Sequence, residues 1–209
     1  MTERRDHWQR VYETKASDRV SWFQEAPTLS VDLITAHTGP EQAVVDIGGG
    51  ASHLPDALLE AGYRSLTVLD LSGAALAMSR YRIGGPSAHV TWIDGDVTLW
   101  TPDRGYDLWH DRAVFHFLTD QADQARYLDV MARALMPGGL AVIMTFAEDG
   151  PETCSGLAVQ RYSPADLAER VADLAPAMFE PMEHGRFTHV TPAGDEQRFQ
   201  YSLFRRAVL

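Results

Sequence analysis

Three consecutive glycines follow a short apolar run, and a lone aspartate ends the next such run a little over twenty residues later. The glycines are Gly48, Gly49 and Gly50, and the aspartate is Asp70. Glycines at a strand-to-helix junction let the backbone approach a ligand without a Cβ atom in the way, and a carboxylate that ends the next strand can accept hydrogen bonds from both hydroxyls of a ribose. The spacing predicts a nucleotide-containing cofactor, although glycines after a strand also serve plain tight turns.

The acidic residues after the third apolar run narrow the choice of cofactor. A phosphate loop of the nucleoside triphosphatase type is excluded, because no Gly-Lys-Ser or Gly-Lys-Thr follows the glycines, and dinucleotides and S-adenosylmethionine remain. Asp94 and Asp96 add negative charge at the edge where open α/β sheets bind ligands. Carboxylates disfavour a pyrophosphate, but they favour a sulfonium cation and accept hydrogen bonds from an adenine amino group. The pattern therefore favours S-adenosylmethionine.

The elements that position these residues alternate between β-rich runs and helical segments. Most of the β-rich runs are apolar on both faces, as in parallel strands covered by helices on each side. They lie at residues 43–47, 66–69, 90–93, 106–109 and 140–144. Caps, apolar spacing and terminal Gly or Pro residues predict helices at residues 55–61, 74–82, 120–135 and 163–172.

The C-terminal pattern is different, because residues 187–190 and 199–204 flank a polar turn as in an antiparallel hairpin. We therefore predict an α/β fold of three layers, with a mostly parallel sheet and a C-terminal antiparallel hairpin. The whole chain, residues 1–209, is read as one domain with a core over residues 41–209. Residues 1–40 are predicted to form a helical lid over the functional edge of the sheet.

Composition limits the partners that this chain can have. A formal net charge of −11 weighs against nucleic acid, since phosphate binding depends on clustered Lys and Arg. No signal peptide and no apolar run long enough for a membrane span are recognised, so we expect no membrane association and a cytoplasmic location. Cys154 is the single cysteine, so an internal disulfide or a cysteine zinc cluster cannot form, and no metal site is expected.

Five short motifs, in the order of the chain, resemble those of class I S-adenosylmethionine-dependent methyltransferases, which have a Rossmann-like sheet of seven strands. The resemblance covers nearly the whole chain. It rests on Asp46-Ile47-Gly48-Gly49-Gly50, Leu69-Asp70-Leu71-Ser72, Asp94-Gly95-Asp96-Val97, Tyr106-Asp107-Leu108-Trp109 and Leu135-Met136-Pro137-Gly138-Gly139. Ser52 departs from the pattern, because the family often has a third loop glycine there.

The resemblance implies a role for each motif. Gly48 and Gly50, with Asp46 before them, would face the methionine portion of the cofactor. Asp70 and Leu71 would lie at the ribose. The adenine would lie against Asp96 and Val97.

Two residues after the fourth strand are the candidates for catalysis. The resemblance places Asp111 near the methyl donor, and His116 follows soon after it. Methyl transfer is an in-line displacement, so a base is needed chiefly for an oxygen acceptor. The structural alternatives carry similar weight, since Asp111 could cap the following helix and His116 could be a buried histidine with satisfied hydrogen bonds.

The acceptor is not specified by the sequence. A small molecule methylated on sulfur, nitrogen or oxygen is favoured, and a protein lysine is the close alternative. The segments His7-Trp8 through Tyr12 and Ser21-Trp22-Phe23 loosely resemble a subgroup that includes both lysine methyltransferases and small thiol methyltransferases. An NAD(P)-dependent oxidoreductase and a non-catalytic cofactor-binding module are the alternatives from other classes. Cys154, Arg161 and His189 have no assigned role.

Overall fold

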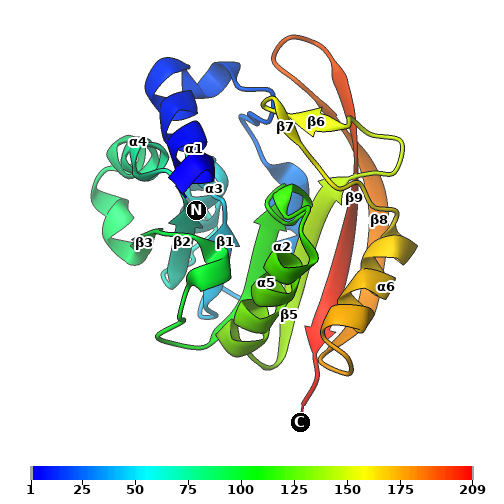
Figure 1. The fold of residues 1–209 in the computed structure, drawn as a ribbon. Coiled ribbons are helices and arrows are strands. Elements are labelled where there is room, and N and C mark those ends of the chain that lie inside the picture. The colour runs from blue at the N-terminus through cyan, green and yellow to red at the C-terminus, as the bar shows by residue number, and fades with distance from the viewer. Residues whose placement is uncertain (1, 209) are drawn as a thin grey trace.

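The computed structural model describes residues 2–208, which form a seven-stranded sheet with helices on both faces (Figure 1). The strand order is β3-β2-β1-β4-β5-β9-β8. The seven strands are β1 (Val44–Ile47), β2 (Leu66–Asp70), β3 (Val90–Asp94), β4 (Tyr106–Arg112), β5 (Leu135–Phe146), β8 (Phe179–Val190) and β9 (Glu196–Arg206). A separate pair of two-residue strands, β6 (Thr153–Cys154) and β7 (Leu157–Ala158), forms a small hairpin.

Strands β1 to β5 are parallel, β9 is antiparallel to β5, and β8 pairs antiparallel with β9. The predicted fold class is therefore confirmed. The starts of β5 and β8 differ most from the prediction. Strand β5 begins at Leu135, directly after a helix, and the pairing with β4 jumps from Leu135 to Leu140, so the intervening Pro-Gly-Gly lies in an irregular strand start. Strand β8 begins at Phe179, well before the predicted start at residue 187. The sequence did not reveal this first part, because the mixed polar residues of the exposed edge strand lack an apolar alternation.

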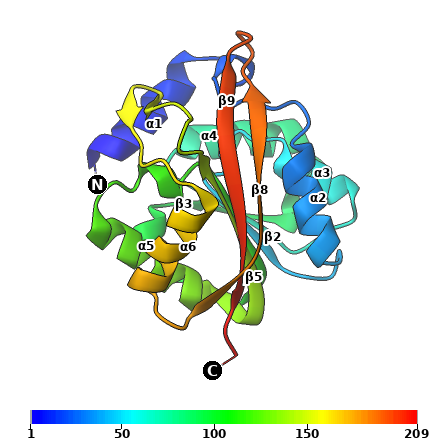
Figure 2. The same cartoon turned by 90° about the vertical axis from the view of Figure 1, so that its right-hand side faces the viewer.

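The helices form the two outer layers (Figure 2). Their bounds are α1 (Thr2–Thr14), α2 (Thr28–His37), α3 (Leu54–Glu60), α4 (Gly73–Ile83), α5 (Gln121–Ala134) and α6 (Pro164–Leu174), with short 3-10 turns η1 (Ser17–Arg19), η2 (Gly85–His89), η3 (Val97–Leu99) and η4 (Phe115–Phe117). Helices α2, α3 and α4 share one apolar cluster with the sheet, and α5 and α6 share the other.

Neighbouring residues of each parallel strand contribute to opposite clusters. Val44 and Leu108 pack with the α2–α4 layer, whereas Val45 and Trp109 pack with the α5–α6 layer. This alternation follows from the two-residue repeat of a strand, and it explains why the strands are apolar on both faces. The direction of a side chain at the end of a strand is therefore fixed by its position along that strand.

Helix α1 and the β6–β7 hairpin lie above the carboxyl ends of the parallel strands (Figure 1). Two ion pairs tie α1 to the edge, one from Arg5 to Asp94 at 2.6 Å and one from Arg4 to Asp123 at 2.6 Å. Within residues 2–208, no helix combines the length and the apolar content needed to cross a membrane.

Candidate active site

The glycine loop connects β1 to α3 at the carboxyl edge of the sheet. Gly48 and Gly50 have positive φ angles of 70° and 40°, which favour glycine. A Cβ atom on Gly50 would lie 2.9 Å from Oδ2 of Asp70 and 3.2 Å from the hydroxyl of Tyr12. The loop therefore needs glycine both for its backbone conformation and for the close approach of its neighbours.

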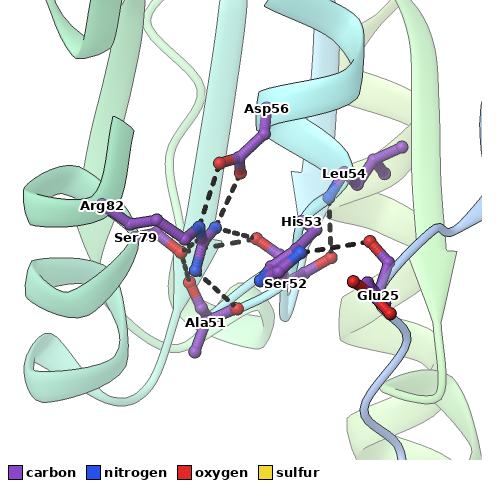
Figure 3. A network of polar contacts seen from close by, with 9 residues as sticks. Glu25, Ala51, Ser52, His53, Leu54, Asp56, Ser79 and Arg82 are labelled. Carbon is purple, nitrogen blue, oxygen red and sulfur yellow. Dashed lines mark hydrogen bonds and ion pairs between the residues drawn. The ribbon is translucent and has the colours of Figure 1, made fainter. Parts of the chain in front are cut away.

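Polar contacts fix the path of the chain after the glycines (Figure 3). The Arg82 guanidinium on α4 donates to the carbonyl oxygen of Ser52 at 2.6 Å and pairs with Asp56 at 2.7 Å. The Ser52 hydroxyl accepts a hydrogen bond from the Leu54 amide at 3.1 Å, at the start of α3. The Ser52 side chain thus binds the first residue of α3, which a glycine at this position could not do.

Asp70 ends β2 and lines a cavity beside the loop. Its Oδ1 accepts a hydrogen bond from the Ser72 amide at 2.7 Å. Burial raises the pKa of the Asp70 carboxyl to about 7, and the nearby carboxylates of Asp46 and Asp94 act in the same direction. A ligand that donates hydrogen bonds to this carboxylate would stabilise its ionised form.

Asp46 lies beneath the glycine loop in a buried polar chain. Its Oδ1 is 2.7 Å from Nδ1 of His110, and Nε2 of that histidine is 2.9 Å from the hydroxyl of Ser30 on α2. Oδ2 of Asp46 is buried and has no hydrogen-bond partner among residues 2–208. Asp46 lines a second cavity with Gly48 and Gly49, so the free oxygen is suited to a cationic or N–H group of a ligand.

The predicted cofactor residues come together around these two adjoining cavities. The first cavity is lined, among others, by Gly48, Asp70, Leu71, Asp96 and Val97. Asp46 lines the second cavity, and Gly50 contacts Asp70 from beneath the first. Residues from β1, β2 and β3 therefore meet at one edge, as expected for parallel strands that end together.

Aromatic side chains cover the first cavity on the side of the N-terminal segment. The ring of Trp8 lies edge-on to Trp22, with 5.5 Å between centroids, and to Phe117 at 5.1 Å. The Trp22 indole donates a hydrogen bond to the Tyr12 hydroxyl at 3.1 Å. These four side chains line the cavity and give it an apolar wall that can exclude water from a reaction.

Asp111 is fully buried and lines neither cavity. Its Oδ1 accepts a hydrogen bond from the Val114 amide at 2.7 Å, and its Oδ2 accepts one from the Phe115 amide at 2.9 Å and one from the Tyr127 hydroxyl at 2.6 Å. Burial raises the pKa of Asp111 to about 6, against the effect of these hydrogen bonds. In this geometry Asp111 holds the turn after β4 onto α5, and its catalytic role stays a prediction.

His116 is also fully buried and lines neither cavity. Its Nδ1 accepts a hydrogen bond from the Phe146 amide at 3.3 Å, and its Nε2 has no partner among the described residues. Burial and the nearby Arg112 lower the pKa of His116 to about 3, so the ring is neutral at physiological pH. The catalytic role of His116 likewise stays a prediction.

The three residues without an assigned role lie in different surroundings. Cys154 lines the first cavity, and burial raises the pKa of its thiol to about 11. Arg161 pairs with Glu152 at 3.2 Å in a separate surface hollow. His189 is 2.7 Å from the carbonyl oxygen of Ser21, to which its Nε2 can donate. Only Cys154 of these three lines either cavity of the site.

The sequence placed Arg112 at the expected mouth of the pocket, but it did not identify Val114 and Leu118, in the turn that follows β4, as walls of the site. Arg112, Val114 and Leu118 line the first cavity, and β4 extends to Arg112, three residues beyond the predicted end. The register of the parallel strands β1 and β4 could have located this wall. Ile47 lies opposite Asp111, so the residues that follow them, Gly48 and Arg112, come together at the edge of the sheet. The residue after Asp111 therefore lies beside the first loop glycine.

Three comparisons relate this chain to known proteins. Residues 44–139 match the family model for a methyltransferase domain. An eEF1A lysine and N-terminal methyltransferase of Mus musculus is 22% identical over 85% of this chain and 27% of the mouse protein. The chain spans about a quarter of the length of the first curated relatives that it matches.

Two solved structures share the fold over nearly the whole chain. The N-methyltransferase NodS of Bradyrhizobium japonicum WM9, in complex with S-adenosyl-L-homocysteine, has a TM-score of 0.72 and 18% identity, and the match covers 96% of this chain and 99% of NodS. The 1,6-didemethyltoxoflavin-N1-methyltransferase of Burkholderia thailandensis has a TM-score of 0.70 and 21% identity, and the match covers 99% of this chain and 85% of that enzyme.

The fold and the matched domain agree with the motifs of the sequence. The fold is shared with these structures, and the domain match begins at β1 and ends within the irregular start of β5. Residues 44–139 therefore form a methyltransferase domain, and the chain has the Rossmann-like fold of these methyltransferase structures.

Proposed function

We propose that this chain transfers a methyl group from S-adenosylmethionine to a small-molecule acceptor. The observation that carries the proposal is the meeting of five of the seven predicted cofactor residues around one cavity at the carboxyl edge of the sheet. These residues are Gly48, Asp70, Leu71, Asp96 and Val97. The structure of NodS with S-adenosyl-L-homocysteine supports the same choice of cofactor.

The residues present fit this cofactor. The unpartnered Oδ2 of Asp46 is suited to the amino group of the methionine portion, and Asp70 is suited to the two ribose hydroxyls. Asp96 and Val97 would hold the adenine, and the glycine loop allows the backbone to approach closely. When bound, the cofactor supplies a methyl group on a positively charged sulfur.

Positioning and the exclusion of water are the main tasks left to the chain. Trp8, Trp22 and Phe117 would exclude water at the mouth of the cavity. A thiol or amine acceptor needs little help from a base, and the low pKa of His116 makes it a weak base at neutral pH. An unchanged turnover rate in His116→Ala, measured with the true acceptor, would remove its predicted catalytic role.

A small molecule fits the acceptor side better than a lysine does. The carboxylates that line the first cavity within residues 2–208 are Asp70 and Asp96, and both are assigned to the cofactor. A lysine side chain would meet the Arg112 cation at this cavity, which disfavours its approach. The toxoflavin methyltransferase, whose structure holds 1,6-didemethyltoxoflavin, also supports a small molecule, while the relatives named as eEF1A lysine and N-terminal methyltransferases keep protein lysine as the alternative.

Two measurements test this function. Titration calorimetry should detect binding of S-adenosylhomocysteine and no binding of NADH. The reverse result would refute the choice of cofactor. Methyl-labelled S-adenosylmethionine is then incubated with the enzyme and with the small-molecule and protein fractions of an extract. We expect label in the small-molecule fraction. Label in the protein fraction alone would support the lysine alternative, and label in neither would support a non-catalytic binding module.

We also propose that residues 1–40 act as a lid and that the protein works in the cytoplasm. The ion pairs of Arg4 with Asp123 and of Arg5 with Asp94 hold α1 over the cavity that Trp8 lines, which supports the lid. The cytoplasmic location is based on the sequence alone.

A further inference from the structure

Arg112, at the end of β4, carries a buried guanidinium with unused hydrogen-bond donors. Its Nη1 donates to the carbonyl oxygen of Trp22 at 2.9 Å. Its Nε and Nη2 are buried and have no partner in the part of the chain that the structure describes. Because a buried cation without a counter-charge is costly, unused donors of this kind indicate a ligand that is an anion.

Arg112 lines both cavities of the site, and its side chain extends toward β9. Its Cζ lies 5.4 Å from the centroid of the Phe199 ring on β9. In the sheet, β5 separates β4 from β9, whereas β1, β2 and β3 lie on the other side of β4. The guanidinium therefore points toward the side of the site that is left for the acceptor.

No carboxylate among the described residues forms an ion pair with the Arg112 guanidinium. Cys154 lines the same cavity, and burial raises the pKa of its thiol, which keeps it neutral. Burial and the Arg112 charge lower the pKa values of His116 and His189, so both rings are neutral as well. The Asp46 carboxylate acts to raise the pKa of Arg112, but its Oδ1 is held by His110 and its free Oδ2 is assigned to the cofactor. Arg112 itself stays charged, since burial lowers its pKa only to about 10.

We propose that Arg112 binds a carboxylate of the methyl acceptor. A guanidinium has a planar fork of N–H donors that matches the two oxygens of a carboxylate. Trp8, Trp22 and Phe117 line the same cavity and suit a flat or apolar body next to that carboxylate. The acceptor is therefore a small aromatic or apolar acid. This inference rests on the proposed function and names its class of substrate.

Three acids and their neutral amides serve as probes: benzoate, phenylacetate and 3-phenylpropionate. Each is titrated by calorimetry into the enzyme after saturation with S-adenosylhomocysteine, at neutral pH. We expect at least one acid to bind at least tenfold more tightly than its amide, because a charge-assisted hydrogen bond to a buried guanidinium is lost in the amide. Equal binding of all three acid and amide pairs, or binding of no acid, would overturn the inference.

The variant Arg112→Gln tests the residue itself. We expect it to lose the preference for the acid while it binds S-adenosylhomocysteine as the original enzyme does, and this retained binding shows that it is folded. Arg112→Lys keeps the charge without the fork and should give an intermediate preference. Arg198→Gln is the matched control, because it makes the same change of charge at an exposed residue next to Phe199 and should keep the full preference.

The outcomes separate the inference from the proposed function. If S-adenosylhomocysteine fails to bind the original enzyme, the proposed function is wrong. If it binds, but Arg112→Gln weakens it tenfold or more and leaves the preference for the acid intact, Arg112 serves the cofactor and the inference is overturned. An unchanged preference for the acid in Arg112→Gln overturns it in the same way.

Discussion

Cofactor affinity should depend on pH through the carboxyl group of Asp70. Burial raises its pKa to about 7 in the free protein, so the group carries a proton for much of the range below neutral pH. The ionised carboxylate can accept hydrogen bonds from both ribose hydroxyls, whereas the protonated carboxyl has one oxygen that carries a proton and accepts more weakly. Binding therefore favours the ionised form, and below pH 7 the loss of the proton must accompany binding.

The size of the effect follows from that pKa. At pH 8 most of the free protein has an ionised Asp70, and at pH 5 about one molecule in a hundred does, if the pKa is about 7. The dissociation constant of S-adenosylhomocysteine should therefore rise about 100-fold from pH 8 to pH 5, which corresponds to about 2.7 kcal/mol. The direction of the change follows from the raised pKa, because the carboxyl group is protonated at the acid end of this range and binds the cofactor more weakly there.

Titration calorimetry over pH 5 to 8 measures this dependence. The variant Asp70→Asn keeps the shape of the side chain but does not titrate in this range. Its affinity for S-adenosylhomocysteine should therefore be weak and nearly independent of pH. Asp129→Asn changes the charge equally on the exposed face of α5 and should follow the original enzyme. A dissociation constant that is the same at pH 5 and pH 8, or a full pH dependence in Asp70→Asn, would refute the reasoning.

Three further predictions concern single residues. Asp111→Ala removes the acceptor of three buried hydrogen bonds and should lower the free energy of unfolding by about 3 kcal/mol in a urea titration; a change below about 1 kcal/mol would contradict the structural role. The ring of His116 should show no titration by NMR between pH 5 and 8 and should carry its proton on Nε2, whereas a midpoint near 6.5 would contradict its burial. Gly50→Ala should weaken S-adenosylhomocysteine at least tenfold by calorimetry, since its Cβ would crowd Asp70, and unchanged affinity would show that the loop adapts.

The fold could be predicted because its signals are local and repeated. Five apolar runs, separated by helical segments with clear caps, are enough to specify parallel strands between two layers of helices. The start of β5 could not be predicted, since Pro137 and two glycines normally end a helix without continuing as a strand. In this chain the pairing with β4 skips over them, and this depends on contacts distant in the sequence.

The cofactor residues were easier to locate than the catalytic candidates for a geometric reason. Residues at the ends of parallel strands meet at one edge whatever their exact register, so Asp70 and Asp96 could be placed from strand order alone. The face to which a side chain inside a strand points depends on whether its position along the strand is odd or even. Asp111 shares the parity of Trp109 and faces α5, where Tyr127 binds it, and a shift of one residue would have turned it to the other face.

The same strand order places most of the acidic groups of the site on one side of β4, while the Arg112 guanidinium reaches the other side. Asp46, Asp70 and Asp96 come from β1, β2 and the end of β3, whereas Arg112 extends toward β9 on the other side of β4. A cofactor with a cationic sulfur and N–H donors suits the acidic half, and an anionic acceptor suits the half that holds the guanidinium. The net charge of −11 hides this division, since it sums over the whole surface. Because each half attracts one reactant, the charges favour the arrangement in which the acceptor faces the methyl group with its carboxylate turned toward β9.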